Sequence, residues 1–370
     1  MIEPAPANHS ASKVVRRRPT FVEEIDIESL PIGERSRLMV ELVENGIGQP
    51  IRVPVVVARG RRPGPVFGIT AALHGNELNG IPVIHKLLDK LNLRTLRGSV
   101  VCVIVANMPG LMVERREFID GQDLNHIMPG KPDGKLSQVY AYNLVNKIVR
   151  HFDYLIDLHT ASQGRVNSLY VRADLRQEIT AQMAYLLRPQ IVVHNPPSDY
   201  TLRGTADEMD HPAITVEICD PQKFQRDPIA RTVRGIRRVL NHVKMLPSRQ
   251  TVLPVPTLPV LCKKSYWILA KRGGLMTVHH RITDRVKQGE LLATQVNIYG
   301  DLMHEYLAPE DGIIIGHCVN PMGQTGERIV HLGIEMDEEE KHAFELESGG
   351  SLGRAIDRAE EHGAGGLTSL

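Results

Sequence analysis

The chain has 370 residues, and this length favours one large domain with a smaller partner, or two domains of similar size. Hydrophobic residues make up 42% and charged residues 24%, a globular composition that excludes a wholly disordered or fibrous chain. Because 44 Lys and Arg residues balance 43 Asp and Glu residues, we expect neither nucleic acid nor an anionic membrane as a partner. The sequence has neither a run of 18 apolar residues nor the apolar core of a secretory signal, and we therefore expect a cytoplasmic protein.

The beginning of the chain predicts a loose arm followed by edge strands. Residues 1–20 are polar and basic, which is typical of a solvated arm. Residues 21–57 alternate apolar and polar side chains between Gly and Pro breaks, and this alternation predicts antiparallel strands at the edge of a sheet.

The middle of the chain has the pattern of an α/β protein. Short apolar runs occupy residues 66–73, 99–106, 154–158 and 213–218. A helical pattern with apolar residues at every third or fourth position follows the first run, over residues 77–91. Short continuous apolar runs between helices are typical of buried strands, so we predict a mostly parallel sheet flanked by helices.

The sequence changes character near residue 250, where four prolines fall within residues 247–259 and predict a linker. We therefore expect a catalytic domain over residues 21–250. Short β-like runs between Gly and Asp turns then predict a small all-β domain over residues 251–336. The tail, residues 337–370, is expected to be either helical or mobile.

Polar residues that can bind a metal follow two of the predicted strands. His74 and Glu77 come directly after the first run, and His159 directly after the third. In open α/β sheets, ligands bind beyond the carboxyl ends of the strands. Two imidazoles and one carboxylate are also a ligand set of hydrolytic zinc sites, which keep one position open. The sequence therefore predicts one zinc ion held by these three residues.

Glu217 interrupts the otherwise apolar run 213–218. An unpaired buried carboxylate is costly, so this side chain has either a partner or a use for its raised proton affinity. Hydrolysis of an amide needs a group that accepts a proton from water and later delivers it to the leaving nitrogen. Glu217 is the candidate for this role, and a structural ion pair is the alternative.

A long polar loop over residues 114–126 contains further candidates. Arg116 and Asn125 are suited to a substrate carbonyl or carboxylate. Asp123 is a candidate to hold a ligand histidine in the tautomer that binds metal. Taken alone, such a loop is more often a solvated surface.

The motifs at residues 74–77, 116–125, 157–160 and 215–217 together resemble the succinylglutamate desuccinylase and aspartoacylase family, which is grouped with the zinc carboxypeptidases. The resemblance runs from about residue 60 to residue 335. It implies a zinc-carboxypeptidase-like mixed sheet with a small C-terminal β domain, and a zinc site of His74, Glu77 and His159. It further implies Glu217 as general base and proton shuttle. Arg116 is implied to stabilise the oxyanion and Asn125 to bind the substrate carboxylate.

The sequence departs from the family at position 126. The family's Asp-Leu-Asn-Arg ends here in His126, so the arginine that binds a substrate carboxylate is missing. Histidine is a weaker and pH-dependent substitute. Another arginine therefore takes over this role, or the substrate differs; the candidates are Arg165, Arg172 and Arg203.

These inferences predict a zinc-dependent deacylase that hydrolyses small N-acylated amino acids or related amines. A metallocarboxypeptidase that acts on peptides is the nearest alternative, and a non-catalytic zinc-dependent binding protein is another. The expected partner is a small molecule, and homo-oligomerisation is left open.

Overall fold

The computed structural model describes residues 18–198, 200–247 and 258–364. The domain boundary expected near residue 250 lies outside the described residues, as does nearly all of the arm expected over residues 1–20.

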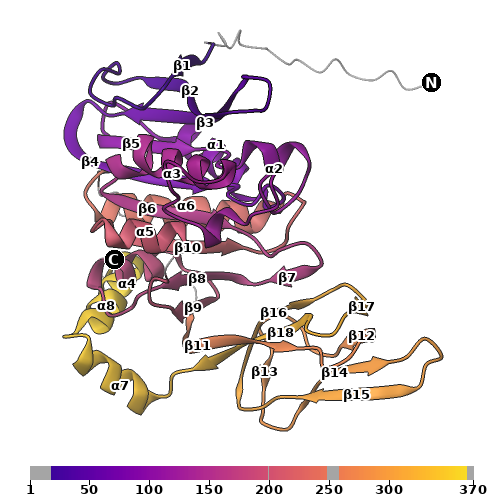
Figure 1. The fold of residues 1–370 in the computed structure, drawn as a ribbon. Helices are drawn as coiled ribbons and strands as arrows, with labels where there is room; N and C mark the ends of the chain where they lie inside the picture. The colour runs from indigo at the N-terminus through magenta and orange to yellow at the C-terminus, as the bar shows by residue number, and fades with distance from the viewer. Residues whose placement is uncertain (1–17, 199, 248–257, 365–370) are drawn as a thin grey trace, which may run out of the picture.

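A large mixed sheet runs through the molecule and carries the four predicted apolar runs as strands β4, β5, β6 and β10 (Figure 1). Its fourteen strands in the described chain follow the spatial order β1 (Thr20–Val22), β2 (Arg35–Glu44), β3 (Pro50–Arg59), β5 (Arg97–Val103), β4 (Arg62–Ala71), β6 (Tyr154–His159), β10 (Ala213–Ile218), β8 (Leu169–Ala173), β9 (Ile191–His194), β11 (Val260–Leu269), β18 (Arg328–Glu335), β16 (Gly312–Cys318) and β13 (Arg285–Val286), while β7 (Arg165–Asn167) pairs with β16.

Parallel pairing dominates only in the centre of this sheet. Strands β5, β4, β6 and β10 run parallel to one another, whereas β8 is antiparallel to β10. At the N-terminal edge, β2 and β3 form the antiparallel pair that the alternating pattern predicts. The prediction of a mostly parallel sheet is therefore right for the strands around the site and wrong for the two ends.

Helices cover both faces of the sheet. Helix α1 begins three residues after Glu77, and its apolar positions Val83, Ile84 and Leu87 are fully buried against the sheet. The described helices are α1 (Gly80–Lys90), α2 (Met108–Met112), α3 (Leu136–Lys147), α4 (Glu178–Leu187), α5 (Leu202–Glu208), α6 (Arg226–His242), α7 (Glu338–Glu347) and α8 (Ser351–Ala364), with 3₁₀ turns at Leu124–His126 and Val149–His151.

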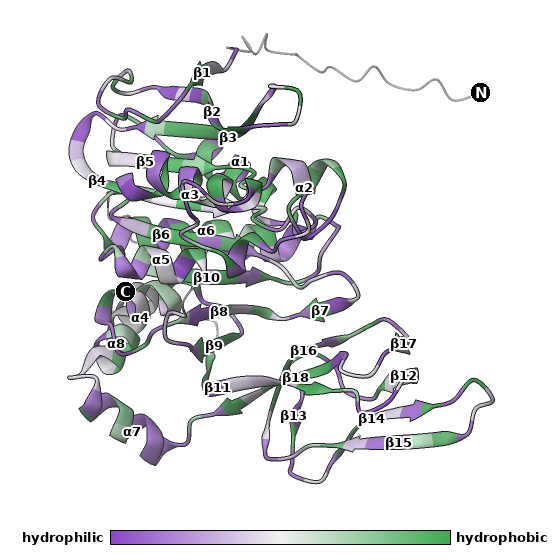
Figure 2. Ribbon diagram, in the orientation of Figure 1, coloured by the Kyte–Doolittle hydropathy of each residue, from purple (hydrophilic) through white to green (hydrophobic). Residues whose placement is uncertain are grey.

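The two faces of β6 belong to different cores, because successive side chains of a strand point to opposite faces. Ile156 and Leu158 join the core beneath α1, α4, α6 and α8, and Leu155 joins the core beneath α3 and α5. Strand β3 is largely hydrophobic, whereas the exposed helix α7 is largely hydrophilic (Figure 2). The side with Leu155 is also the side on which Asp157 and His159 lie.

The C-terminal strands only partly form a sheet of their own. Four of them make a separate antiparallel sheet in the order β15 (Leu302–Leu307), β14 (Leu291–Val296), β12 (Gly274–Val278) and β17 (Met322–Gly323). Strands β11, β18, β16 and β13 instead continue the large sheet. The predicted small C-terminal β domain is thus confirmed in part, since half of its strands extend the sheet of the first domain.

After β18 the chain returns to the first domain. Helix α8 packs beside α4 (Figure 1), where Arg354 Nε donates to Glu178 and Ser351 Oγ donates to the carbonyl of Leu175. Within the described residues, no helix is both long enough and apolar enough to cross a bilayer.

Candidate functional site

The first two metal-binding candidates lie on the short loop between β4 and α1. His74 and Glu77 are both 2% exposed. The loop carries Gly75, and a Cβ atom at this position would lie 2.0 Å from the backbone of Gly110. A glycine is therefore required for the loop to press against α2 and hold both side chains beside the end of the sheet.

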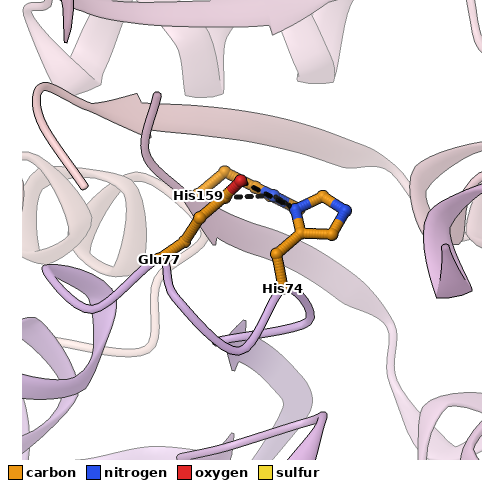
Figure 3. Close-up of side chains that lie close together, drawn as sticks. All are labelled: His74, Glu77 and His159. Carbon is orange, nitrogen blue, oxygen red and sulfur yellow. Dashed lines mark hydrogen bonds and ion pairs between the residues drawn. The ribbon is translucent and has the colours of Figure 1, made fainter. Parts of the chain in front are cut away.

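His159, the last residue of β6, meets this pair from the neighbouring strand (Figure 3). Its Nδ1 lies 3.1 Å from Nδ1 of His74 and 3.0 Å from Oε2 of Glu77. His74 Nδ1 lies 2.9 Å from Oε1 of Glu77. The three residues that the sequence singled out thus converge on one point from two chain segments.

The far side of each imidazole faces a carboxylate. His74 Nε2 lies 3.0 Å from Asp123 Oδ1, and His159 Nε2 lies 2.6 Å from Asp157 Oδ2. Since an ionised carboxylate only accepts hydrogen bonds, both Nε2 atoms carry the proton. Asp157 is in turn oriented by Thr70, whose hydroxyl donates to Oδ1 over 2.5 Å. Both Nδ1 lone pairs are consequently directed at the shared point.

This donor set fits a divalent cation. Two imidazole lone pairs and a carboxylate repel one another when they converge, unless a cation or protons lie between them. Ligand atoms about 2.0 to 2.1 Å from a tetrahedral zinc ion lie about 3.3 Å apart, close to the separations between His74, Glu77 and His159. Among the described residues these three are the group with metal-binding spacing.

The same crowding governs the pKa values of these groups. Burial alone would lower the pKa of His159, but the carboxylates of Asp157 and Glu77 raise it well above its usual value. Burial would raise the pKa of Glu77, and the two histidines outweigh it and lower that pKa. Both shifts are in the direction expected for metal-binding donors, at which a cation and protons compete for the same position.

Glu217 lies beside this centre. It is the direct cross-strand neighbour of His159 in the β6–β10 pair. Its Oε2 is buried without a hydrogen-bond partner, and Oε1 lies 3.8 Å from Nε of Arg172. Burial raises the pKa of Glu217, Glu77 raises it further, and His159 opposes the shift. A carboxylate with one unpartnered oxygen and raised proton affinity is suited to accept and deliver a proton.

Arg116 also reaches the centre from its loop. Its Nη1 donates to Glu77 Oε1 over 2.8 Å and to Ser162 Oγ over 3.0 Å, and its Nε donates to Asp123 Oδ2 over 2.9 Å. Within the described residues, Nη2 has no hydrogen-bond partner. This arrangement fixes the guanidinium and leaves Nη2 available to a ligand.

All the residues proposed from the sequence except Asp123 line one cavity of about 240 Å³. Asn125 is held there by its Oδ1, which accepts from the backbone N–H of Leu202 over 2.8 Å, so the amide NH2 is the group left for a ligand. The side chain of His126 is 71% exposed and stands at the rim, 3.7 Å from Asp123.

The three candidate arginines line the cavity in different environments. Arg172 donates to the hydroxyl of Tyr170 over 2.8 Å and lies beside Glu217. Arg203 is 5% exposed and donates to the backbone and side-chain oxygens of Asn195, and burial lowers its pKa to about 10. Arg165 has a buried Nε with no partner in the described chain. The guanidinium groups of Arg172 and Arg203 donate hydrogen bonds to the protein, whereas that of Arg165 donates none within the described chain.

The sequence analysis assigned no role to Asp157, Trp267 or Arg328, which all lie at this site. The position of Asp157 could have been predicted, because it lies two residues before His159 and therefore on the same face of β6. Trp267 and Arg328 line the cavity from β11 and β18. Neither had a local signal, since each is a single residue in a short β run and reaches the site only through pairing of strands distant in sequence.

The fold and the site define a class of protein: an α/β enzyme with a buried three-donor centre and a carboxylate at the carboxyl ends of its central strands. The model for the succinylglutamate desuccinylase/aspartoacylase catalytic domain matches residues 63–243. Over this segment the chain is therefore similar to the catalytic domain of a family of deacylases.

The similarity to known proteins also extends beyond that segment. It is 25% identical over 277 residues to the N-alpha-acetyl-L-2,4-diaminobutyric acid deacetylase of Halomonas elongata, covering 71% of this chain and 80% of that protein. The product-bound ectoine utilization protein EutE (DoeB) of Ruegeria pomeroyi superposes with a TM-score of 0.74 at 20% identity, over 83% of this chain and 98% of that one. A succinylglutamate desuccinylase/aspartoacylase of Rhodobacter sphaeroides gives the same score and identity, over 85% and 100%. These structures establish that the fold is shared.

Proposed function

We propose that this protein is a zinc-dependent deacylase that hydrolyses the amide bond of a small N-acylated amino acid or a related amine. One observation carries the proposal: the Nδ1 atoms of His74 and His159 and the carboxylate of Glu77 converge beside the unpartnered oxygen of Glu217.

His74, Glu77 and His159 would hold the zinc ion, one per chain. A zinc ion bound there supplies Lewis-acid activation of water and of the scissile carbonyl. Asp123 and Asp157 hold the two imidazoles in the tautomer that presents Nδ1, and their negative charge makes these nitrogens better donors.

Three other residues of the cavity would carry out the proton transfer, the stabilisation of the oxyanion and the binding of the substrate. Glu217 accepts a proton from the attacking water and then delivers it to the departing amine, which needs a carboxylate whose pKa lies above the usual value. Arg116 donates through Nη2 to the oxygen that gains negative charge on the substrate carbonyl. Asn125 offers its amide NH2 to a polar group of the substrate.

The size of the cavity favours a small substrate. Its volume of about 240 Å³ is below the range of roughly 300–1,000 Å³ that is typical of small-molecule pockets. The relative from Halomonas elongata is named for the deacetylation of an N-acetylated amino acid. This name supports the same reaction class here, with the acyl and amine portions left open.

A substrate panel with metal analysis tests the proposal. Purified protein should contain about one zinc per chain and hydrolyse N-acetyl or N-succinyl amino acids, with activity lost on chelation and restored by zinc. A protein that binds no stoichiometric metal, or that hydrolyses none of these amides when loaded with zinc, would disprove it.

The same panel separates the two alternatives. A carboxypeptidase would hydrolyse peptides faster than N-acyl amino acids, and the small cavity argues against this outcome. A non-catalytic zinc-dependent binding protein would be loaded with metal and inert towards every amide. The convergence of Glu217 and Arg116 on the centre favours catalysis, because a binding protein needs neither a proton shuttle nor an oxyanion donor.

A further inference from the structure

Two arginines from distant parts of the chain share one aromatic surface at the cavity. The guanidinium carbon of Arg165 lies 5.5 Å from the ring centroid of Trp267, and that of Arg328 lies 5.8 Å from the same centroid. Arg165 begins β7 in the catalytic part, while Trp267 and Arg328 belong to the C-terminal strands β11 and β18. All three residues line the cavity that contains the metal centre.

The ring of Trp267 also stacks on a buried histidine. Trp267 and His331 are direct cross-strand partners, and their rings stack with centroids 4.8 Å apart and an angle of 12° between the planes. His331 is 1% exposed, and its Nε2 lies 2.9 Å from Ser265 Oγ. Trp267 is consequently a fixed surface that positions both guanidinium groups.

These two positive charges form no direct ion pair in the described part of the chain, and the carboxylate of Glu327 acts on Arg165 only from a longer distance. Neither Arg165 nor Arg328 has an ion pair with a described carboxylate, and Nε of Arg165 is buried without a hydrogen-bond acceptor. Burial lowers the pKa of Arg165, and the charge of Arg328 lowers it further. Arg165 is half-buried and Arg328 is exposed. Two neighbouring like charges repel each other, and an anion bound between them relieves that repulsion.

The other arginines of the cavity are already engaged. Arg116 pairs with Glu77 and Asp123, Arg172 lies against Tyr170 and Glu217, and Arg203 donates to Asn195. His126 is at the exposed rim. Arg165 and Arg328 are therefore the guanidinium groups best able to take over the carboxylate binding that an arginine at position 126 would provide.

We propose that Arg165 and Arg328, arranged on Trp267, form the binding site for a carboxylate of the substrate, so that the protein selects acylated amino acids over neutral acylated amines. That the bound carboxylate belongs to a substrate rests on the proposed deacylase function. Binding of an anion by the two arginines can be tested without turnover.

The single tryptophan of the chain provides a direct measurement. Levulinate is a ketone analogue of N-acetylglycine that no amidase hydrolyses, and levulinamide is its uncharged counterpart. Levulinate should change the fluorescence of Trp267 saturably in the full-length protein at constant ionic strength, whereas levulinamide should not. The Kd for levulinate should rise about tenfold to a hundredfold in Arg165→Gln and in Arg328→Gln.

Arg281→Gln is the matched control. Arg281 is exposed, lies between β12 and β13, and does not line the cavity. It should leave this Kd unchanged. Arg165→Lys and Arg328→Lys keep the charge without the planar fork and should restore part of the affinity. Equal binding of levulinate and levulinamide, or an unchanged Kd in both glutamine variants, would overturn the anion site.

Kinetics test whether the protein selects acylated amino acids over neutral acylated amines. The wild-type protein should hydrolyse N-acetylglycine with a higher kcat/KM than N-acetylglycinamide, and Arg165→Gln and Arg328→Gln should abolish this preference mainly by raising KM for the acid. A protein that binds levulinate as expected but hydrolyses no amide would refute the proposed function and leave the anion site standing. Turnover with no preference for the acid would refute the anion site alone.

Discussion

The Nδ1 atoms of His74 and His159 lie 3.1 Å apart although the residues are 85 positions apart in the chain. Carboxylates occupy the Nε2 side of both rings, so each ring turns its lone pair towards the other. Two acceptor lone pairs at this distance are stable only with a cation or a proton between them. The pair therefore explains why the centre is suited to a metal.

Replacing Glu217 with glutamine should remove the proton shuttle and keep the metal centre. The amide has nearly the same shape as the carboxylate, but it neither accepts nor delivers a proton. We expect kcat to fall by about 10² to 10⁴, with zinc content unchanged by elemental analysis. A Glu217→Gln protein that retains most of its turnover would show that another group acts as the base.

Replacing His159 with alanine should release the metal. The remaining pair, His74 and Glu77, provides only two of the three ligands of a hydrolytic zinc site. We expect zinc content to fall well below one per chain after dialysis, together with loss of activity. His85→Ala changes an exposed histidine on α1 and should retain both metal and activity. Full zinc content in the His159→Ala protein would contradict the ligand assignment.

Replacing Asp157 with asparagine should weaken metal binding without removing a ligand. Asp157 accepts from Nε2 of His159, and an asparagine in its place no longer fixes the tautomer by its charge. We expect zinc affinity to fall by about 10- to 100-fold, measured by competition with a chromophoric chelator. Asp89→Asn, on the exposed side of α1, is the control and should leave this affinity unchanged.

His331 should make the folded state less stable in mild acid. Burial lowers its pKa well below 6.5, and the charges of Arg172 and Arg328 lower it further. Below pH 6.5 the unfolded chain therefore binds a proton that the folded chain does not, so stability falls as pH decreases. The slope for such a group approaches about 1.4 kcal/mol per pH unit.

The measurement is the free energy of unfolding in urea between pH 7 and pH 5, with zinc held constant. His331→Phe keeps a ring against Trp267 and removes the titration, so its stability should depend less on pH than that of the wild type. The exposed His85→Gln should show the wild-type dependence. Parallel curves for wild type and His331→Phe would refute this assignment.

The strand positions could be predicted because buried strands must be apolar on both faces, as the run 213–218 shows. The carboxyl ends of β4 and β6 could also be located, and with them His74, Glu77 and His159. Strand direction beyond the centre could not be predicted, because parallel and antiparallel neighbours accept the same apolar side chains. This is why β8 pairs antiparallel with β10 and why β11 and β18 extend the large sheet.

The sequence by itself determined the chemical kinds of group that this protein places at its strand ends, since an imidazole or a carboxylate beside a buried strand is costly unless it has a function. It also determined that the arginine expected at position 126 is absent. Only the tertiary structure decided which of the remaining arginines are engaged and which are available. The Arg165–Trp267–Arg328 arrangement depends on the pairing of β7 with β16 and of β11 with β18, and such long-range pairing has no signature in any local run of residues.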